Sequence, residues 1–374
     1  MKRRPTPTFL LLLAVCMSAG QNNKKNIPYA DLPVRPAKED KKDASPQPAP
    51  LVREPRAAVS AETSRLVFRT STLSAKGLLS QQTRDALHGL VRAHGSEEIL
   101  ELRAFVAGSG DMRRVQEIAA EVFADKKELP ALTVVQVGAL PLERAQVVIE
   151  SAAEAKKTVN PYGVAFVAAQ PAASLDAAAA KVKALLETRD MSMDSLLRMT
   201  CYVSDLEGAP AQPAGVPIPV TVVQMQREPV RPRAACEAIA RAEKPQTEAV
   251  QFVDGTMVGG TGVDGTRGSP EMAVVSAPRV VMTGLQLGFG EQEPDVKLAF
   301  ERLQKDIGGA NGDLRHTVMA HYYLLSASVS PMVRKLRGEF EGSALPASTM
   351  LGFEGLPSVD AAFAMDVVAL PAAQ

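Results

Sequence analysis

The chain has 374 residues, enough for two to four domains of ordinary size, and its hydrophobic share of 46% and charged share of 22% are typical of a globular protein. Lys plus Arg and Asp plus Glu balance at 42 each, so the basic excess common in nucleic-acid-binding proteins is missing. With 4% aromatic residues and no Trp, platforms for base stacking are also scarce, and we expect no nucleic-acid partner.

Residues 1–20 have the layout of a secretory signal, with basic Lys2-Arg3-Arg4, an apolar run from Phe9 to Val15, and small residues up to Gly20. This run is far shorter than the ~20 residues that span a bilayer, so we predict export to the periplasm or the extracellular space and no membrane span. Leu13-Ala14-Val15-Cys16 also has the outline of a bacterial lipobox. The alternative is therefore an outer-membrane lipoprotein with a lipid anchor at Cys16.

Residues 21–61 are rich in Lys, Asp, Pro and Gln and lack a sustained apolar period. Such a segment cannot bury enough apolar surface to offset the entropy lost on ordering. We predict a disordered linker here.

The remainder contains one pattern three times: Pro130-Ala131-Leu132-Thr133, Pro219-Val220-Thr221 and Pro346-Ala347-Ser348-Thr349, each followed by apolar residues. A pattern repeated within one chain indicates a supersecondary unit that packs on its own copies. We therefore predict three domains, at residues 62–157, 158–246 and 247–374.

The first and third domains share the order β-α-β-α-β-β, read from alternating and helical apolar periods. In chain order, the first has strands at 66–70, 99–107, 131–137 and 146–152, with helices around 83–94 and 115–122. The third has strands at 279–286, 316–325, 347–353 and 362–370, with helices around 296–307 and 333–340.

The middle domain departs from this order after its strand at 164–168, its helix around 175–186 and its strand at 197–204. Residues 205–217 are too short and too interrupted by Pro for a second helix, and strands at 221–226 and 234–240 follow directly. Residues 250–268 form a Gly-rich insertion ahead of the third domain, which we predict to be a hairpin or loop because the strand and helix of a phosphate-binding loop are missing.

Two cysteines of the middle domain, Cys201 and Cys236, could form a disulfide in an oxidising compartment. Both lie in apolar runs that resemble strands. We therefore favour two buried thiols that pack as small apolar residues.

The Pro-Ala-x-Thr strand, Leu-Pro about ten residues later, and Glu237-Ala238-Ile239-Ala240 on the last strand resemble the RidA family, also called YjgF or endoribonuclease L-PSP. Residues 196–205 resemble the second-strand signature of that family. The resemblance covers about residues 62–374. It implies an α+β, chorismate-mutase-like fold that assembles as a homotrimer with a small-molecule cleft at each interface. Three copies in one chain would form an intrachain pseudo-trimer, in which each sheet buries its second face against the others.

Family enzymes are enamine and imine deaminases that hold the substrate carboxylate with the Arg of Pro-Ala-Arg, because a planar guanidinium pairs bidentately with a carboxylate. This chain has Leu132, Val220 and Ser348 at those substrate-binding positions, and Leu and Val have no donor. Arg198 and Arg315 are nominal replacements, although both lie near strand starts.

The acid on the last strand of the family corresponds to Glu150, Glu237 and Asp366, the candidate catalytic residues. A buried carboxylate there can act as a base or orient water. We favour the alternative that these acids pair within an interface.

The four histidines, His88, His94, His316 and His321, do not have metal-ligand spacing, so we expect no metal and no cofactor, and we interpret them as surface or strand residues. The leading hypothesis is an exported small-molecule binding or interaction module. The alternative is an active enamine or imine deaminase with a rearranged site.

Overall fold

A computed structural model describes residues 53–108, 110–207, 212–226, 233–254, 269–342 and 345–372. The predicted signal at residues 1–20 with Cys16, most of the predicted linker, and residues 255–268 of the Gly-rich insertion lie outside these ranges. Residues 51–374 form one compact unit of mixed α+β structure with several sheets, as predicted. No helix within the described ranges is both long and apolar enough to cross a bilayer.

The first sheet and its two helices come from the N-terminal part of this unit. The sheet has the strand order β2-β5-β3-β4. Its strands are β2 (Leu66–Thr70), β3 (Glu98–Ala107), β4 (Ala131–Val137) and β5 (Val147–Glu154), and its helices are α1 (Leu79–His94) and α2 (Met112–Val122). Asp111 caps α2 by accepting hydrogen bonds from the amides of Arg113 and Arg114.

The second sheet has the order β10-β11-β6-β9-β7-β8. Its strands are β6 (Val164–Ala172), β7 (Leu196–Val203), β8 (Thr221–Gln224), β9 (Ala234–Arg241), β10 (Val250–Val253) and β11 (Met272–Val275). It carries the helix α3 (Leu175–Glu187), after which the short 3₁₀ turn η2 (Met193–Ser195) leads into β7. No helix lies between β7 and β8 in the described residues 204–207 and 212–220.

The third sheet has the order β1-β12-β16-β14-β15, with β13 also paired to β16. Its strands are β1 (Ala58–Glu62), β12 (Arg279–Thr283), β13 (Gln286–Gly288), β14 (Gly312–Leu324), β15 (Ala347–Gly352) and β16 (Phe363–Pro371). The helices α4 (Glu293–Gly309) and α5 (Ser330–Phe340) cover it, and 3₁₀ turns occur at η1 (Thr63–Arg65) and η3 (Ala327–Val329).

All three sheets therefore contain the same four-strand order, β2-β5-β3-β4, β6-β9-β7-β8 and β12-β16-β14-β15. In each set the second and third strands in chain order pair in parallel with each other. The last strand lies between the first and the second and runs antiparallel to both. The predicted strands and helices of the first and third sheets occur where expected, with ends that differ by a few residues.

Two predicted boundaries were wrong because the edge strands cross from one sheet to another. The linker was predicted to run to residue 61, but Ala58–Glu62 is β1 and pairs antiparallel with β12 of the third sheet. The insertion was assigned to the third domain, but its flanks form the hairpin β10–β11, and β11 pairs with β6 of the second sheet. Period-2 patterns show that strands exist but not which neighbour each one joins.

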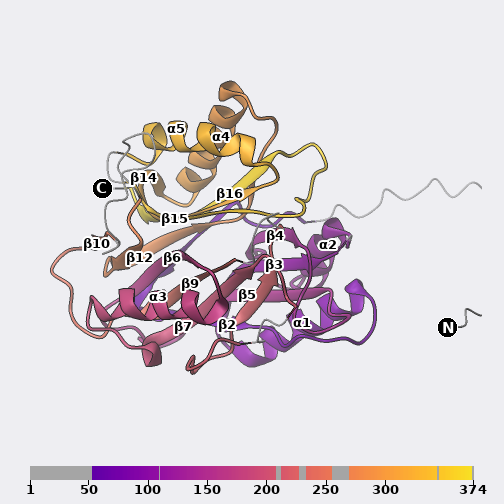
Figure 1. The fold of residues 1–374 in the computed structure, drawn as a ribbon, viewed down its shortest axis with the longest axis horizontal. Helices are drawn as coiled ribbons and strands as arrows, with labels where there is room; N and C mark the ends of the chain where they lie inside the picture. The colour runs from indigo at the N-terminus through magenta and orange to yellow at the C-terminus, as the bar shows by residue number, and fades with distance from the viewer. Residues whose placement is uncertain are drawn as a thin grey trace, which may run out of the picture. The chain divides into compact units, whose positions relative to one another are not determined.

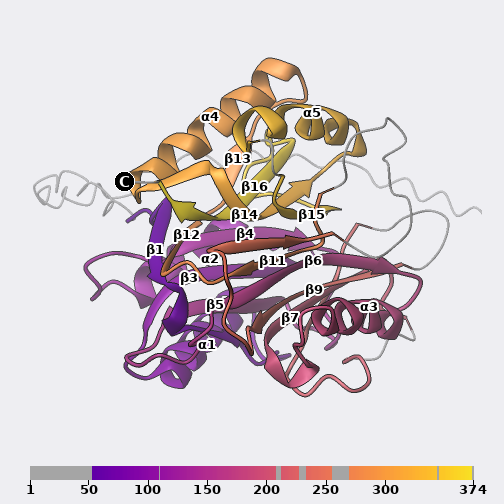
Figure 2. The ribbon, with the colours of Figure 1, turned by 90° about the vertical axis from the view of Figure 1, so that its left-hand side faces the viewer.

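Each sheet has one face under its own helices and one face toward the other sheets. Separate apolar clusters fill the space between the first sheet and α1 and α2, the second sheet and α3, and the third sheet and α4 and α5. Two further clusters draw residues from all three sheets: one contains Leu66, Phe166 and Met282, and the other contains Phe105, Tyr202 and Tyr323. Figures 1 and 2 show the strands inside and the helices α1, α3, α4 and α5 outside.

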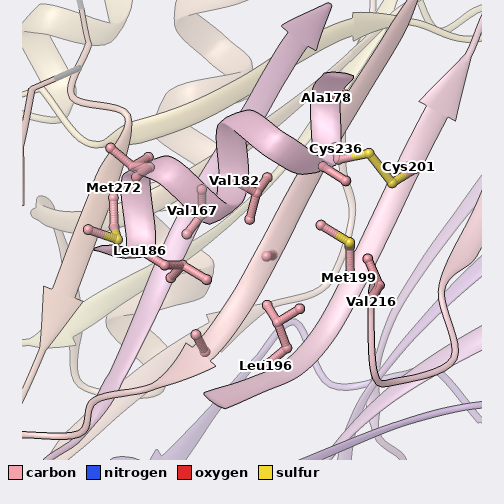
Figure 3. Close-up of a cluster of buried hydrophobic side chains, with 14 of the residues drawn as sticks. Val167, Ala178, Val182, Leu186, Leu196, Met199, Cys201, Val216, Cys236 and Met272 are labelled. Carbon is pink, nitrogen blue, oxygen red and sulfur yellow. A yellow bond between two sulfur atoms is a disulfide. The ribbon is translucent and has the colours of Figure 1, made fainter. Parts of the chain in front are cut away.

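The expectation of two free thiols was wrong, because Cys201 and Cys236 form a disulfide (Figure 3). The two residues are directly opposite each other on the antiparallel strands β7 and β9. Both are fully buried among Met199, Val216 and the side chains of α3. The apolar sequence context suggested burial correctly, but only the register between the strands brings the sulfurs together.

We predict that the double substitution of Cys201 and Cys236 by Ala lowers the free energy of unfolding by about 2–4 kcal/mol, because the crosslink restricts the unfolded chain. The measurement is urea unfolding of the variant and of the wild-type protein, with and without reductant. Identical midpoints for oxidised and reduced wild-type protein would show that the disulfide does not contribute to stability.

Candidate functional site

The three predicted acids meet where the inner faces of the three sheets converge. Glu150 on β5, Glu237 on β9 and Asp366 on β16 occupy the same place in their sheets, and their exposed fractions are only 0%, 4% and 4%. Their direct partners on the neighbouring strands are Arg103, Thr200 and His321, in that order. We call these six residues, together with the threonines described below, the axial network.

Arg103 joins the acids of the first two sheets. Its Nε and Nη2 donate to Glu150 Oε2 at 2.9 and 2.7 Å, and Nη2 lies 2.6 Å from Glu237 Oε1. The same Nη2 also donates to the Thr200 hydroxyl at 2.9 Å, and the guanidinium lies over the Phe105 ring. One buried cation therefore compensates two buried carboxylates.

His321 joins the acids of the second and third sheets. Its Nδ1 lies 2.8 Å from Asp366 Oδ1, and its Nε2 lies 3.2 Å from Glu237 Oε2. Burial alone would lower the pKa of His321, but Glu237 and Asp366 outweigh this effect and raise the pKa to about 9. His321 is therefore charged at neutral pH and is the second cation of the axial network.

The repeated threonines bind the acids of neighbouring sheets in a cyclic arrangement. Thr133 of the first sheet donates to Asp366 of the third at 2.8 Å, and Thr349 of the third donates to Glu237 of the second at 2.9 Å. Thr221 of the second sheet helps to lower the pKa of Glu150 of the first, and its hydroxyl donates to Thr70 of the first sheet at 3.5 Å. The residue that recurs in each Pro-Ala-x-Thr pattern thus tethers one sheet to the next.

Burial would raise the pKa of each acid, but the surrounding cations and donors outweigh it. Arg103 and His321 hold the pKa of Glu237 well below its usual range, and Arg103 with Arg198 lowers the pKa of Glu150. His321 with Arg103 lowers the pKa of Asp366. All three acids are ionised at neutral pH.

Two tyrosines close the network on one side. Tyr202 donates to Glu237 at 3.0 Å and Tyr323 donates to Asp366 at 2.9 Å, while Phe105 occupies the matching place in the first sheet. Phe353 packs edge-on against both tyrosine rings. Water therefore has little access to the acids from this side.

A small cavity lies on the opposite side of the network. It measures about 20 Å³, room for about one water molecule, and is partly open. Its lining includes residues of the network and, from matching places in the three sheets, two further sets: Phe68, Phe166 and Met282, and Glu101, Arg198 and Met319.

The positions of the family Arg do not meet at this network or at one another. Leu132 is buried, and its carbonyl accepts a hydrogen bond from the amide of Leu285 at 3.1 Å. A Cβ on Gly284 would lie 3.2 Å from the backbone of Leu132, so this contact depends on the glycine. Val220 packs at the margin of the cluster under α3.

Ser348 is the exception, because an arginine does reach it. Arg337 of α5 donates from Nη1 to Ser348 at 3.0 Å and from Nη2 to Ser269 at 2.6 Å. Behind it, Glu341 is fully buried beside the Tyr322 hydroxyl, and burial raises the pKa of Glu341 to about 7. Of the nominal replacements, Arg315 is exposed and pairs with Asp313, and Arg198 lines the axial cavity.

Sequence reasoning missed Arg103, and it interpreted His321 as a surface or strand residue. The available signal was a charged or titratable residue in the middle of an apolar strand, as in Leu102-Arg103-Ala104-Phe105 and Ala320-His321-Tyr322-Tyr323. Such residues are rarely buried without a partner. Among the described residues, no group of His, Cys, Asp and Glu has an arrangement that could hold a metal ion.

The comparisons with known proteins agree with the sequence resemblance. Residues 66–155, from β2 to the end of β5, match the model of the family described as Endoribonuclease L-PSP. This match confirms the predicted resemblance to that family for residues 66–155. No curated protein matches the chain significantly.

Several solved structures match parts of the chain. A YjgF/YER057c/UK114 family member from Mycobacterium tuberculosis is 17% identical, with 32% of this chain and 98% of that chain covered and a TM-score of 0.23. A Rid family protein of unknown function from Yersinia pestis is 13% identical, with 33% and 99% covered and a TM-score of 0.28. Yeast Mmf1 is 16% identical, with 25% and 80% covered and a TM-score of 0.23. Similarity at this level does not establish a shared activity.

We predict that Arg103→Met lowers the free energy of unfolding by about 3–5 kcal/mol, because it leaves two buried carboxylates without their shared cation. The matched control is Arg84→Met on α1, which removes an exposed pair with Glu121 and should cost less than about 1 kcal/mol. Urea unfolding monitored by circular dichroism measures both. Equal losses in the two variants would contradict the role given to Arg103.

The raised pKa of His321 predicts a loss of stability at alkaline pH. Its folded pKa of about 9 exceeds the ordinary histidine pKa of 6.5, so its contribution is complete below about pH 6.5 and is lost as the pH rises through about 9. The lowered pKa values of Glu150, Glu237 and Asp366 predict a second loss as the pH falls below the usual range of carboxyl groups.

The measurement is the free energy of unfolding of the wild-type protein and of His321→Gln between pH 5 and about 10. The wild-type curve should decline across the alkaline range, and the His321→Gln curve should be flatter there. The same alkaline slope in both proteins would assign it to another group.

Proposed function

We propose that this protein is an exported, single-chain pseudo-trimer of three divergent RidA-like units that lacks the deaminase chemistry of the family and acts as a small-molecule binding or interaction module. The units are residues 62–157, 158–246 and 247–374, with edge strands exchanged between them and a middle unit without its second helix. The family match of residues 66–155 and the shared four-strand order of the three sheets support this division.

The hydrogen bonds and ion pairs of the three acids are the observation that best supports the loss of deaminase activity. Each acid accepts a hydrogen bond from a threonine and faces at least one buried cation, so every carboxylate oxygen of the three acids already has a partner. A general base must reach the water or proton that it moves. Moreover, Leu132 and Val220 cannot hold a substrate carboxylate in place of the family Arg.

The disulfide supports export, because disulfides persist in oxidising compartments and are rare in reducing ones. The basic, apolar and small-residue segments of residues 1–20 point the same way. The alternative destination is an outer-membrane lipoprotein anchored at Cys16.

A second candidate function, an imine or enamine deaminase that uses one interface, is favoured by Arg337. Its guanidinium bonds the half-buried Ser348, where the family Arg would stand, and Glu341 behind it has a pKa near neutrality. An arginine from a helix could in this way replace the missing arginine of the strand.

We predict no turnover above background when an imino acid is generated in situ and its hydrolysis is followed by ammonia release. The test compares the wild-type protein with Arg337→Ala and with the matched control Arg334→Ala, an exposed arginine on the same helix. Turnover that is lost in Arg337→Ala and kept in Arg334→Ala would replace the proposed function by the deaminase.

A further inference from the structure

The partly open cavity beside the axial network is lined by two side chains of opposite charge that have no hydrogen-bond partner among the described residues. Arg198 of β7 has an exposed fraction of 8% and Glu101 of β3 is half-buried. They occupy matching places in the second and first sheets, and Met319 occupies that place in the third. The cavity is therefore basic on the side of Arg198 and acidic on the side of Glu101.

Neighbouring groups hold the guanidinium of Arg198 in place, but it makes no hydrogen bond to a described residue. Its guanidinium lies 5.3 Å from the centre of the Phe68 ring, and its Nε is 3.7 Å from Glu150, an ion pair without a hydrogen bond. A guanidinium has five donors, and those of Arg198 make no hydrogen bond to a described residue. Arg198 thus presents a planar fork to the cavity in a fixed position, the geometry that pairs bidentately with a carboxylate.

Glu101 faces the same cavity from the neighbouring sheet. Burial raises its pKa, and the nearby Arg198 counters only part of this effect. No ion pair within 4.0 Å joins the two side chains, so a gap separates the opposite charges. A ligand group with positive charge would relieve the unfavourable burial of the Glu101 carboxylate.

The remaining walls are apolar. Apart from the axial network and the two charged side chains, the lining consists of Phe68, Phe166, Met282, Met319 and the aliphatic residues Val167, Ala238, Ile239 and Val368. Beside these walls, Arg198 and Glu101 supply one charge of each sign. A ligand with one charge of each sign can pair with both, whereas a singly charged ligand leaves one of them without a partner.

We propose that this cavity is a binding site for a small zwitterion, with its carboxylate on Arg198, its ammonium group on Glu101, and a short apolar body against Phe68 and Met319. The enclosed space of about 20 Å³ admits about one water-sized group, so only one end of the charged head enters it and the rest of the ligand lies in the open mouth. This inference rests on the proposed binding function and names a site for it away from the three interface positions.

The test is isothermal titration of the full protein with three probes that share a five-carbon body: norvaline, valerate and pentylamine. Norvaline should bind at least tenfold more tightly than either of the singly charged probes. Equal affinity for all three, or no binding of norvaline to the folded wild-type protein, would overturn the proposal.

Two variants separate the roles of the charges. Glu101→Gln should remove the preference for norvaline over valerate, and Arg198→Gln should remove the preference for norvaline over pentylamine. Glu98→Gln, an exposed acid on the same strand, is the matched control and should bind like the wild type. Because Glu101 makes no hydrogen bond to a described residue, Glu101→Gln should fold even if Arg198→Gln does not.

The same titrations can reject the position of this site without rejecting the proposed binding function. If norvaline binding is lost in Arg337→Ala but unchanged in Arg198→Gln and Glu101→Gln, the ligand occupies the interface at Ser348. That result would overturn this inference and leave the proposed binding function in place.

Discussion

The neutralisation of three buried carboxylates by Arg103 and His321, with Arg198 at the margin, is the interaction on which the arrangement of the sheets depends. Glu150, Glu237 and Asp366 come from three different sheets; Arg103 pairs with the first two and His321 with the last two. Without those cations, three like charges at low dielectric would repel one another and the sheets that carry them. The apolar clusters on either side of the network can close only because the charges between them cancel.

This cancellation also explains why matching places in the three sheets differ in chemistry. A homotrimer has to put the same residue three times around its axis, so an acid there would face two copies of itself. In this chain the partners of the acids are Arg103, Thr200 and His321, one of each kind. A single polypeptide can vary each position separately, and both the axial network and the Glu101–Arg198 cavity use that freedom.

Much of the fold could be predicted from the sequence, because the periods of strands and helices and the repeated Thr-centred strand are local signals. The candidate acids were recognised by their place on the last strand, and the structure brings them together. Their partners could not be found in the same way, because Arg103 meets Glu237 and His321 only after three sheets have assembled. The disulfide and the edge strands β1 and β11 were misjudged for the same reason, since register and partner choice are set by tertiary contacts.

The exchanged edge strand β1 also bears on how the chain reaches its native state. Among the described strands, β1 is synthesised first. Its Ala58 pairs with Thr283 of β12, so β1 has no partner until the first two sheets have been synthesised. Until then β1 is an unpaired edge with alternating buried positions, the kind of segment that invites pairing with the wrong chain. Contacts of such long range slow folding. The third sheet can therefore be completed only after synthesis of nearly the whole chain, because β1 and β16 belong to it and lie near opposite ends of the described residues.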